Sequence, residues 1–253
     1  MNDLVLRENK DGAAILTLNR PEKLNALSKD MIDGLEKHVD AIARETRTIG
    51  LVILRGAGGN FSSGHDMHEV LLQVRAHAKP HHYVEVIDKV ANLPQPVISA
   101  VQGHCSTGAL ELALAADLIA ASQSARFCDA YARWGLTPIW GLSLRLPHRV
   151  GTAMAGEMMY TCRSYSGSEA HEMHLANFCF ADERFEEELT RLSAEILDNS
   201  WFSNRVNKRA LLESNGLTLA AAHALRLFKN EGLAPDAFER VSRFFKEERK
   251  PRA

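Results

Sequence analysis

The feature that most constrains this fold is a strand–turn–helix arrangement that occurs twice in the first half of the chain. In each copy an apolar run precedes a turn rich in Gly, Ser and Thr, and a helical pattern follows the turn. The strands cover residues 51–54 and 97–101, and the turns cover residues 61–66 and 103–109. A helix that begins after such a turn presents unpaired backbone N–H groups and the positive end of its dipole.

Other strands and helices surround these two turns. Apolar patterning predicts strands at residues 4–8, 13–18 and 118–121. Helical spacing predicts a helix that begins at Ser28, and a long apolar helix after Gly108. Strands and helices in this order predict a mixed α/β core.

The last part of the chain has a different pattern. Only helical spacing of apolar residues is found after about residue 183. Helices without strands bury their apolar faces against a core or against another subunit. We therefore predict a core with the active site over residues 1–196 and a helical oligomerisation region over residues 197–253.

Composition and charge argue against several classes of protein. The 253 residues are 45% hydrophobic and 25% charged, and the net charge of −2 gives no general attraction to nucleic acid or anionic lipid. The most apolar later stretch, residues 109–121, is too short and too charged to span a membrane. No stretch of signal-peptide length opens the chain, and its four cysteines suggest no disulfide framework, so we expect a cytoplasmic protein.

The two turns can be interpreted in more than one way. Two helix N-termini aimed at one point would form an oxyanion hole, and glycine lets a substrate approach the backbone there. Each turn alone is more typical of an ordinary capped helix, because such turns are common connectors. A nucleotide-binding G-x-G-x-x-G motif is not matched, because Phe61 takes the place of the third glycine after Gly56 and Gly58.

A family resemblance is carried by five segments that follow one another along nearly the whole chain. The segments are Leu18 to Pro21 with Asn25 to Leu27, Phe61 to Met67, Gln102 to Asp117, Ala125 to Pro138, and Phe245 to Pro251. In this order they resemble the crotonase superfamily, the enoyl-CoA hydratase/isomerase family. The resemblance implies an α/β fold, a spiral of repeated ββα units with an all-helical C-terminal trimerisation region. It also implies a homotrimer or dimer of trimers, and an acyl-CoA substrate that carries coenzyme A, with no separate cofactor.

The same resemblance implies where the substrate binds. It places the two oxyanion N–H groups on His65 and Gly108. Further substrate-binding positions are Leu24, Ala26, Ser63, Asp66, Met67 and, near the C-terminus of a neighbouring subunit, Lys246 and Lys250. The two lysines are equally typical of a solvated tail.

Glu111 is the predicted acid–base residue. A carboxylate in an apolar helix is costly unless it is paired or used, although the first helical turn lowers that cost. By resemblance, Glu111 aligns with a catalytic glutamate of the hydratases, and a helix-start Glu that points to water is the alternative.

The second glutamate of the hydratases falls at Tyr131, which is the main departure from the family pattern. Tyrosine has a reference pKa of about 10 and is therefore a hydrogen-bond donor rather than a base near neutrality. If residues 127–131 are extended, Asp129 shares a face with Tyr131 and is a candidate replacement. The alternative is that Asp129 caps a helix and Tyr131 packs.

His65 is a second departure. The pattern G-H-D-x-H-E at residues 64–69 resembles the methylmalonyl-CoA decarboxylase branch, and a histidine can orient a carboxylate. Metal binding is the other interpretation, but no spacing matches a known metal site, so we expect none.

Three bulky residues follow Tyr131, namely Trp134, Ile139 and Trp140. Their size favours a small or unusual acyl group over a long fatty chain, and ordinary core packing is the alternative. Hydration of a 2-enoyl-CoA is thus the favoured activity. Decarboxylation or isomerisation of a short acyl-CoA, and acyl-CoA binding with little catalysis, are the other hypotheses.

Overall fold

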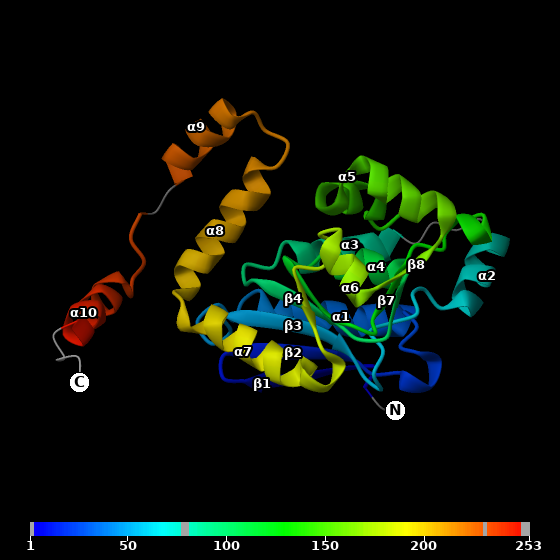
Figure 1. The fold of residues 1–253 in the computed structure, drawn as a ribbon, viewed down its shortest axis with the longest axis horizontal. Helices are drawn as coiled ribbons and strands as arrows, with labels where there is room; N and C mark the ends of the chain where they lie inside the picture. Colours follow the sequence, from blue (N-terminus) through cyan, green and yellow to red (C-terminus); the bar gives the residue numbers. More distant parts are fainter. Residues whose placement is uncertain (1–2, 77–80, 230–231, 249–253) are drawn as a thin grey trace.

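The computed structural model describes residues 3–76, 81–229 and 232–248, and a six-stranded sheet lies at its centre (Figure 1). The sheet has the order β1-β2-β3-β4-β6-β9. Its strands are β1 (Val5–Lys10), β2 (Ala13–Leu18), β3 (Leu51–Gly56), β4 (Val97–Val101), β6 (Leu118–Ser122) and β9 (Phe178–Phe180). The first pair is antiparallel and the other pairs are parallel.

A second, three-stranded sheet has the order β5-β7-β8. Its short strands are β5 (His104–Ser106), β7 (Arg126–Cys128) and β8 (Ser164–Ser166). Strands and helices alternate through most of the chain, so the prediction of a mixed α/β fold is confirmed.

Helices cover both faces of the large sheet. Side chains along each strand alternate between the two faces, and here both sets are apolar, so each face needs a cover. Leu16 and Val52 point toward α1 (Lys29–Ile42), α3 (His81–Ala91) and α4 (Gly108–Ala113). Ile53 and Ile98 point to the opposite face, where α7 (Phe185–Asp198) packs. Both faces are buried, as is usual for parallel strands.

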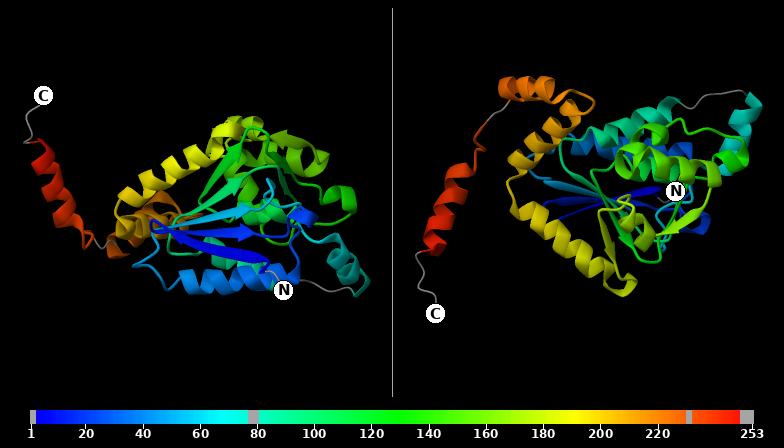
Figure 2. Two further views of the ribbon diagram at one scale, coloured as in Figure 1. Left: turned by 90° about the horizontal axis from the view of Figure 1, so that it is seen from below. Right: turned by 45° about the horizontal axis from the view of Figure 1, so that its top comes forward.

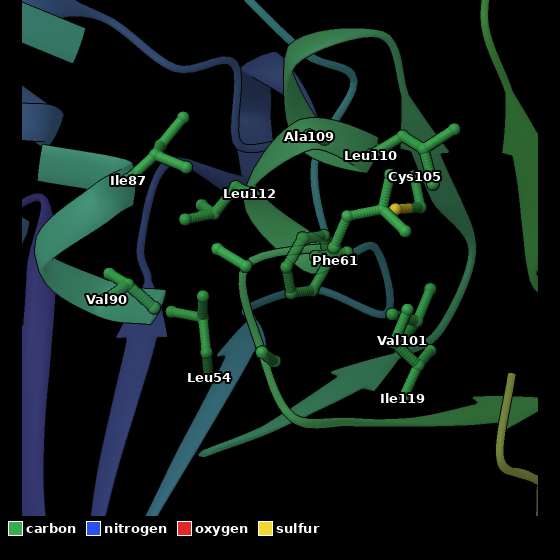
Figure 3. Packing of buried hydrophobic residues seen from close by; sticks show 14 of the residues in the cluster. Leu54, Phe61, Ile87, Val90, Val101, Cys105, Ala109, Leu110, Leu112 and Ile119 are labelled. Carbon is green, nitrogen blue, oxygen red and sulfur yellow. The ribbon is translucent and has the colours of Figure 1, made fainter. Parts of the chain in front are cut away.

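Phe61 lies in the core beneath the two turns. Its side chain is fully buried. Figure 3 shows Phe61 below α4, with Leu54 of β3 and Val101 of β4 nearby. Burial of one such side chain contributes roughly 1.5–3 kcal/mol, so Phe61 fixes the first turn against the core.

The predicted turn at residues 103–109 and the long helix after it differ from the structure. The turn contains strand β5, and α4 is only six residues long. The apolar residues 114–116 are buried in the connection that leads to β6. Their apolarity therefore reflects core packing and not a longer helix.

The remaining helices lie around this core or extend from it. They are α2 (Met67–Ala76), α5 (Leu142–Thr161), α6 (Gly167–Glu172), α8 (Trp201–Ser214), α9 (Leu219–Lys229) and α10 (Ala237–Glu248), with short 3-10 helices η1 (Pro21–Lys23), η2 (Ala132–Trp134) and η3 (Asp182–Arg184). Among the described helices, none is long and apolar enough to cross a membrane. The predicted boundary after residue 196 falls near the end of α7 and stays a prediction.

The C-terminal helices are attached to the core through α8. A Cβ on Gly50 would lie 2.4 Å from the Trp201 ring, and the Lys208 Nζ donates to the Asp117 carboxylate at 2.7 Å. Helix α10 stands away from the core in the views of Figures 1 and 2. Large apolar side chains of these helices and their connections are exposed, including Leu211, Leu219, Leu233, Phe238, Val241, Phe244 and Phe245.

Candidate active site

The two turns predicted from the sequence lie side by side. The Ser62 N–H donates to the His104 carbonyl at 2.8 Å, and the Ser106 N–H donates to the Ser62 carbonyl at 3.3 Å. The Phe61 N–H also donates to the carbonyl of Gln102 at 2.7 Å. These bonds join the turns as a short parallel bridge. Two segments about 40 residues apart in sequence therefore lie next to each other in the fold.

Two glycines allow this close approach. Gly64 has φ +100°, and a Cβ there would lie 2.5 Å from the Ser106 carbonyl oxygen and 3.4 Å from the Gly108 nitrogen. A Cβ on Gly108 would lie 2.3 Å from Cζ3 of Trp140. A side chain at either position would therefore push the turns or the Trp140 ring apart.

The amide N–H groups of His65 and Gly108 are not used for folding. Within the described part of the chain, neither N–H donates a hydrogen bond, although the neighbouring Gly64 and Asp66 amides do. Backbone donors inside a folded protein are almost always paired, so an unpaired N–H on each of the two bonded turns is free to bind a ligand oxygen.

The His65 ring lies in an aromatic cluster. Its centroid is 4.8 Å from that of Tyr83 and 4.9 Å from that of Trp140. Burial lowers the pKa of His65, and the nearby Glu69 and Asp66 carboxylates only partly oppose this. The imidazole is therefore mostly neutral near pH 7 and can donate or accept one hydrogen bond.

Glu111 is fully buried, at 0% exposure, and its carboxylate accepts three hydrogen bonds. The Tyr131 Oη donates to Oε2 at 2.5 Å, and the amides of Trp140 and Leu142 donate to Oε1 at 2.9 and 3.1 Å. Burial raises the pKa of Glu111, and these donors oppose the rise. The alternative of a glutamate that points to water is therefore wrong.

Asp129 and Tyr131 do not share an extended face, because strand β7 ends at Cys128. Tyr131 has helical backbone angles, φ −57° and ψ −48°, and its N–H donates to the Asp129 carboxylate at 3.0 Å. Burial raises the pKa of Asp129, and it raises the pKa of the Tyr131 hydroxyl still further, with Glu111 adding to the effect. Tyr131 is thus a neutral hydroxyl near pH 7.

A cavity of about 1270 Å³ opens beside these groups. Most predicted site residues line it, namely Ala26, Ser63, His65, Asp66, Met67, Tyr131, Trp134, Ile139 and Trp140. Four predicted residues are not in its lining, namely Leu24, Gly108, Glu111 and Asp129. Trp134 and Ile139 are 58% and 50% exposed, whereas Trp140 is 1% exposed. Of these three bulky residues, Trp140 alone forms part of the inner wall of the cavity.

Cationic side chains also line the cavity. Arg20 and Lys23 line it, and Arg20 pairs with the Asp66 carboxylate at 2.6 Å. Although burial opposes it, the bonds from Arg20 and from the His68 amide lower the pKa of Asp66. Lys250 and the side chain of Lys246 lie outside the described residues, so their predicted contact stays a prediction. No cluster of three metal-binding side chains is found in the described ranges.

The contacts of Tyr83 and the position of Arg133 in the site were not predicted from the sequence. Tyr83 packs on both His65 and Trp140, and its hydroxyl donates to Glu69 at 2.6 Å. Arg133 also lines the cavity, next to Tyr131. Tyr83 lies on a helical stripe that predicts only burial, and no local pattern indicated its partners.

Comparison with known proteins agrees with this architecture. The family Enoyl-CoA hydratase/isomerase matches residues 8–252. The probable enoyl-CoA hydratase echA12 of Mycobacterium bovis is 35% identical over 232 residues, covering 87% of this chain and 80% of the relative. The 1,2-epoxyphenylacetyl-CoA isomerase of Escherichia coli strain K12 is 29% identical over 225 residues, covering 87% and 86%. The crystal structure of an enoyl-CoA hydratase from Bacillus anthracis has a TM-score of 0.88 at 29% identity, covering 98% of each chain. This chain therefore belongs to the enoyl-CoA hydratase/isomerase family of the crotonase superfamily and is an enzyme of that family.

Proposed function

We propose that this enzyme hydrates a 2-enoyl-CoA thioester and holds the thioester oxygen between the amides of His65 and Gly108. The observation that carries the proposal is the pair of unpaired N–H groups on two turns that are hydrogen-bonded to each other. Addition of water to the β-carbon moves negative charge onto the thioester oxygen. Preorganised N–H donors stabilise such a charge, and loss of one donor typically lowers the rate by ~10²–10³.

Glu111 and Tyr131 form the proposed acid–base pair. Tyr131 lines the cavity and its hydroxyl donates to Glu111, so Tyr131 connects the buried carboxylate to the substrate. As the water oxygen bonds to the β-carbon, Tyr131 takes the water proton and passes its own proton to Glu111. The reverse transfer then delivers one proton to the α-carbon, so that one water molecule is added and both side chains are restored.

Asp129 has a supporting role in this proposal. Its carboxylate accepts the Tyr131 amide and is not in the cavity lining. A carboxylate bound in this way fixes the turn that carries Tyr131, and we therefore assign the proton transfer to Tyr131 and not to Asp129.

Isomerisation of an enoyl-CoA is the second candidate. A single carboxylate–hydroxyl pair can move a proton from one carbon to another without activating water, and the site contains one such pair.

The proposed reaction is tested with crotonyl-CoA, by following the loss of enoyl absorbance and the product mass. The wild type should form the 3-hydroxyacyl-CoA, and Glu111→Gln should lower the rate at least 10²-fold while butyryl-CoA binding stays within about twofold. Full activity of Glu111→Gln would remove Glu111 from the mechanism. Tight binding without turnover on a broad enoyl-CoA panel would instead support a binding protein.

We also propose that α8, α9 and α10 pack against other copies of the chain. Phe238 is 85% exposed and Leu219 is 88% exposed, which is unfavourable for a monomer in water. A homotrimer or a dimer of trimers would cover these side chains. Sedimentation equilibrium measures the mass, and a monomer at all concentrations would contradict the proposal.

A further inference from the structure

Trp140 is the inner wall of the cavity and stands at the candidate oxyanion site. It is the one bulky residue of the predicted trio that is fully buried, and its ring edge contacts Gly108 so closely that a Cβ there would lie 2.3 Å away. An acyl chain whose thioester oxygen lies at the Gly108 amide therefore begins beside the indole ring.

Packing and stacking hold the indole ring in this place. Trp140 stacks on Tyr83 with centroids 4.9 Å apart and an interplanar angle of 11°, and the Tyr83 hydroxyl is bonded to Glu69. The Trp140 backbone N–H is bonded to Glu111. A displaced ring would lose a stacked aromatic partner and a large buried apolar area.

The indole N–H plays no part in holding the ring. It is buried and has no hydrogen-bond partner among the described residues. A phenyl ring at this position would keep the wall and remove an unsatisfied donor, whereas a small aliphatic side chain would remove the wall.

We propose, on the basis of the hydratase function proposed above, that Trp140 backed by Tyr83 determines specificity by limiting the length of the acyl group. The substrates are then short-chain acyl-CoA thioesters, and longer chains bind only if Trp140 is displaced.

Saturated acyl-CoA thioesters test this limit without any reaction. In an open apolar site, each buried methylene should tighten binding by roughly fourfold, so decanoyl-CoA would bind more tightly than butyryl-CoA. Titration calorimetry on the wild type should instead find decanoyl-CoA at least tenfold weaker than butyryl-CoA. Equal or tighter binding of decanoyl-CoA would overturn the proposal without any variant.

Substitutions of Trp140 test whether this residue sets the length limit. Trp140→Ala should shift the decanoyl-to-butyryl affinity ratio by at least tenfold toward decanoyl-CoA, and Trp140→Phe should stay within about threefold of the wild type. If circular dichroism shows that Trp140→Ala is unfolded, Trp140→Leu replaces it. A folded small variant with the wild-type ratio would refute the assignment to Trp140. If crotonyl-CoA is hydrated but decanoyl-CoA binds as tightly as in an open site, the length limit is refuted and the proposed function stands. If no thioester binds, both the length limit and the proposed function are refuted.

Discussion

Tyr131→Phe is the sharpest test of the proposed acid–base pair, because it removes one hydroxyl and keeps the ring. The Oη to Oε2 distance of 2.5 Å is that of a charge-assisted hydrogen bond. Such a bond to a charged group contributes about 1.5–3 kcal/mol, and its loss leaves one oxygen of the buried Glu111 carboxylate without a partner. We therefore expect the free energy of unfolding in urea to fall by about 2 kcal/mol.

The rate should fall more than the stability. General acid–base groups contribute typically 10²–10⁴-fold, so kcat on crotonyl-CoA should drop at least 10²-fold while the affinity for butyryl-CoA changes little. The remaining Glu111 carboxylate also loses a donor that favours its charged form, which raises its pKa further. The base is needed in its charged form, so the acid limb of the kcat profile should move to higher pH.

A purely structural role for Tyr131 gives a different result. Tyr131→Phe would then lose stability and its acid limb would still move, because Glu111 loses a donor in either case, but kcat measured on the folded protein above that limb would match the wild type. That outcome would refute the proton transfer through Tyr131.

Two further substitutions test the scaffold. Gly64→Ala should lower the free energy of unfolding in urea by about 2 kcal/mol and kcat on crotonyl-CoA at least 10²-fold, because the added methyl group meets the second turn. Gly59 also has a positive φ, +73°, but open space around it, so Gly59→Ala measures the effect of backbone strain alone in the same assays. Lys208→Met should lower the free energy of unfolding by about 2–3 kcal/mol, since it breaks a mostly buried pair with Asp117, whereas Lys29→Met at an exposed pair should change nothing measurable.

The positions of the two turns could be predicted because their signals are local. In each copy a β-branched run, a glycine-containing turn and a helix start lie within about 20 residues. Glycine is required at positions 64 and 108, because a Cβ there would collide with neighbouring atoms. The family resemblance then placed His65 and Glu111, and the structure brings their elements together.

The surroundings of Glu111 could not be predicted, because its donors come from distant parts of the chain. Tyr131, Trp140 and Leu142 lie 20, 29 and 31 residues away, on a segment whose path depends on tertiary packing. The prediction that Asp129 shares an extended face with Tyr131 was wrong for a related reason. It assumed an extended strand to residue 131, but the chain turns into η2 after Cys128.

Strand β4 is connected to α8 at one end and to the second turn of the site at the other end. Loss of Lys208 should therefore lower stability more than it lowers the rate. The Asp117 carboxylate that pairs with Lys208 also accepts the Val97 N–H, at the start of β4. The second turn leaves the other end of β4, after Val101, about 13 Å away at 3.3 Å per residue. All described residues that line the cavity lie between positions 20 and 140. Loss of the Lys208 anchor should therefore loosen α8 and the start of β4, while the amides at the far end keep their place and kcat of the folded protein stays near that of the wild type.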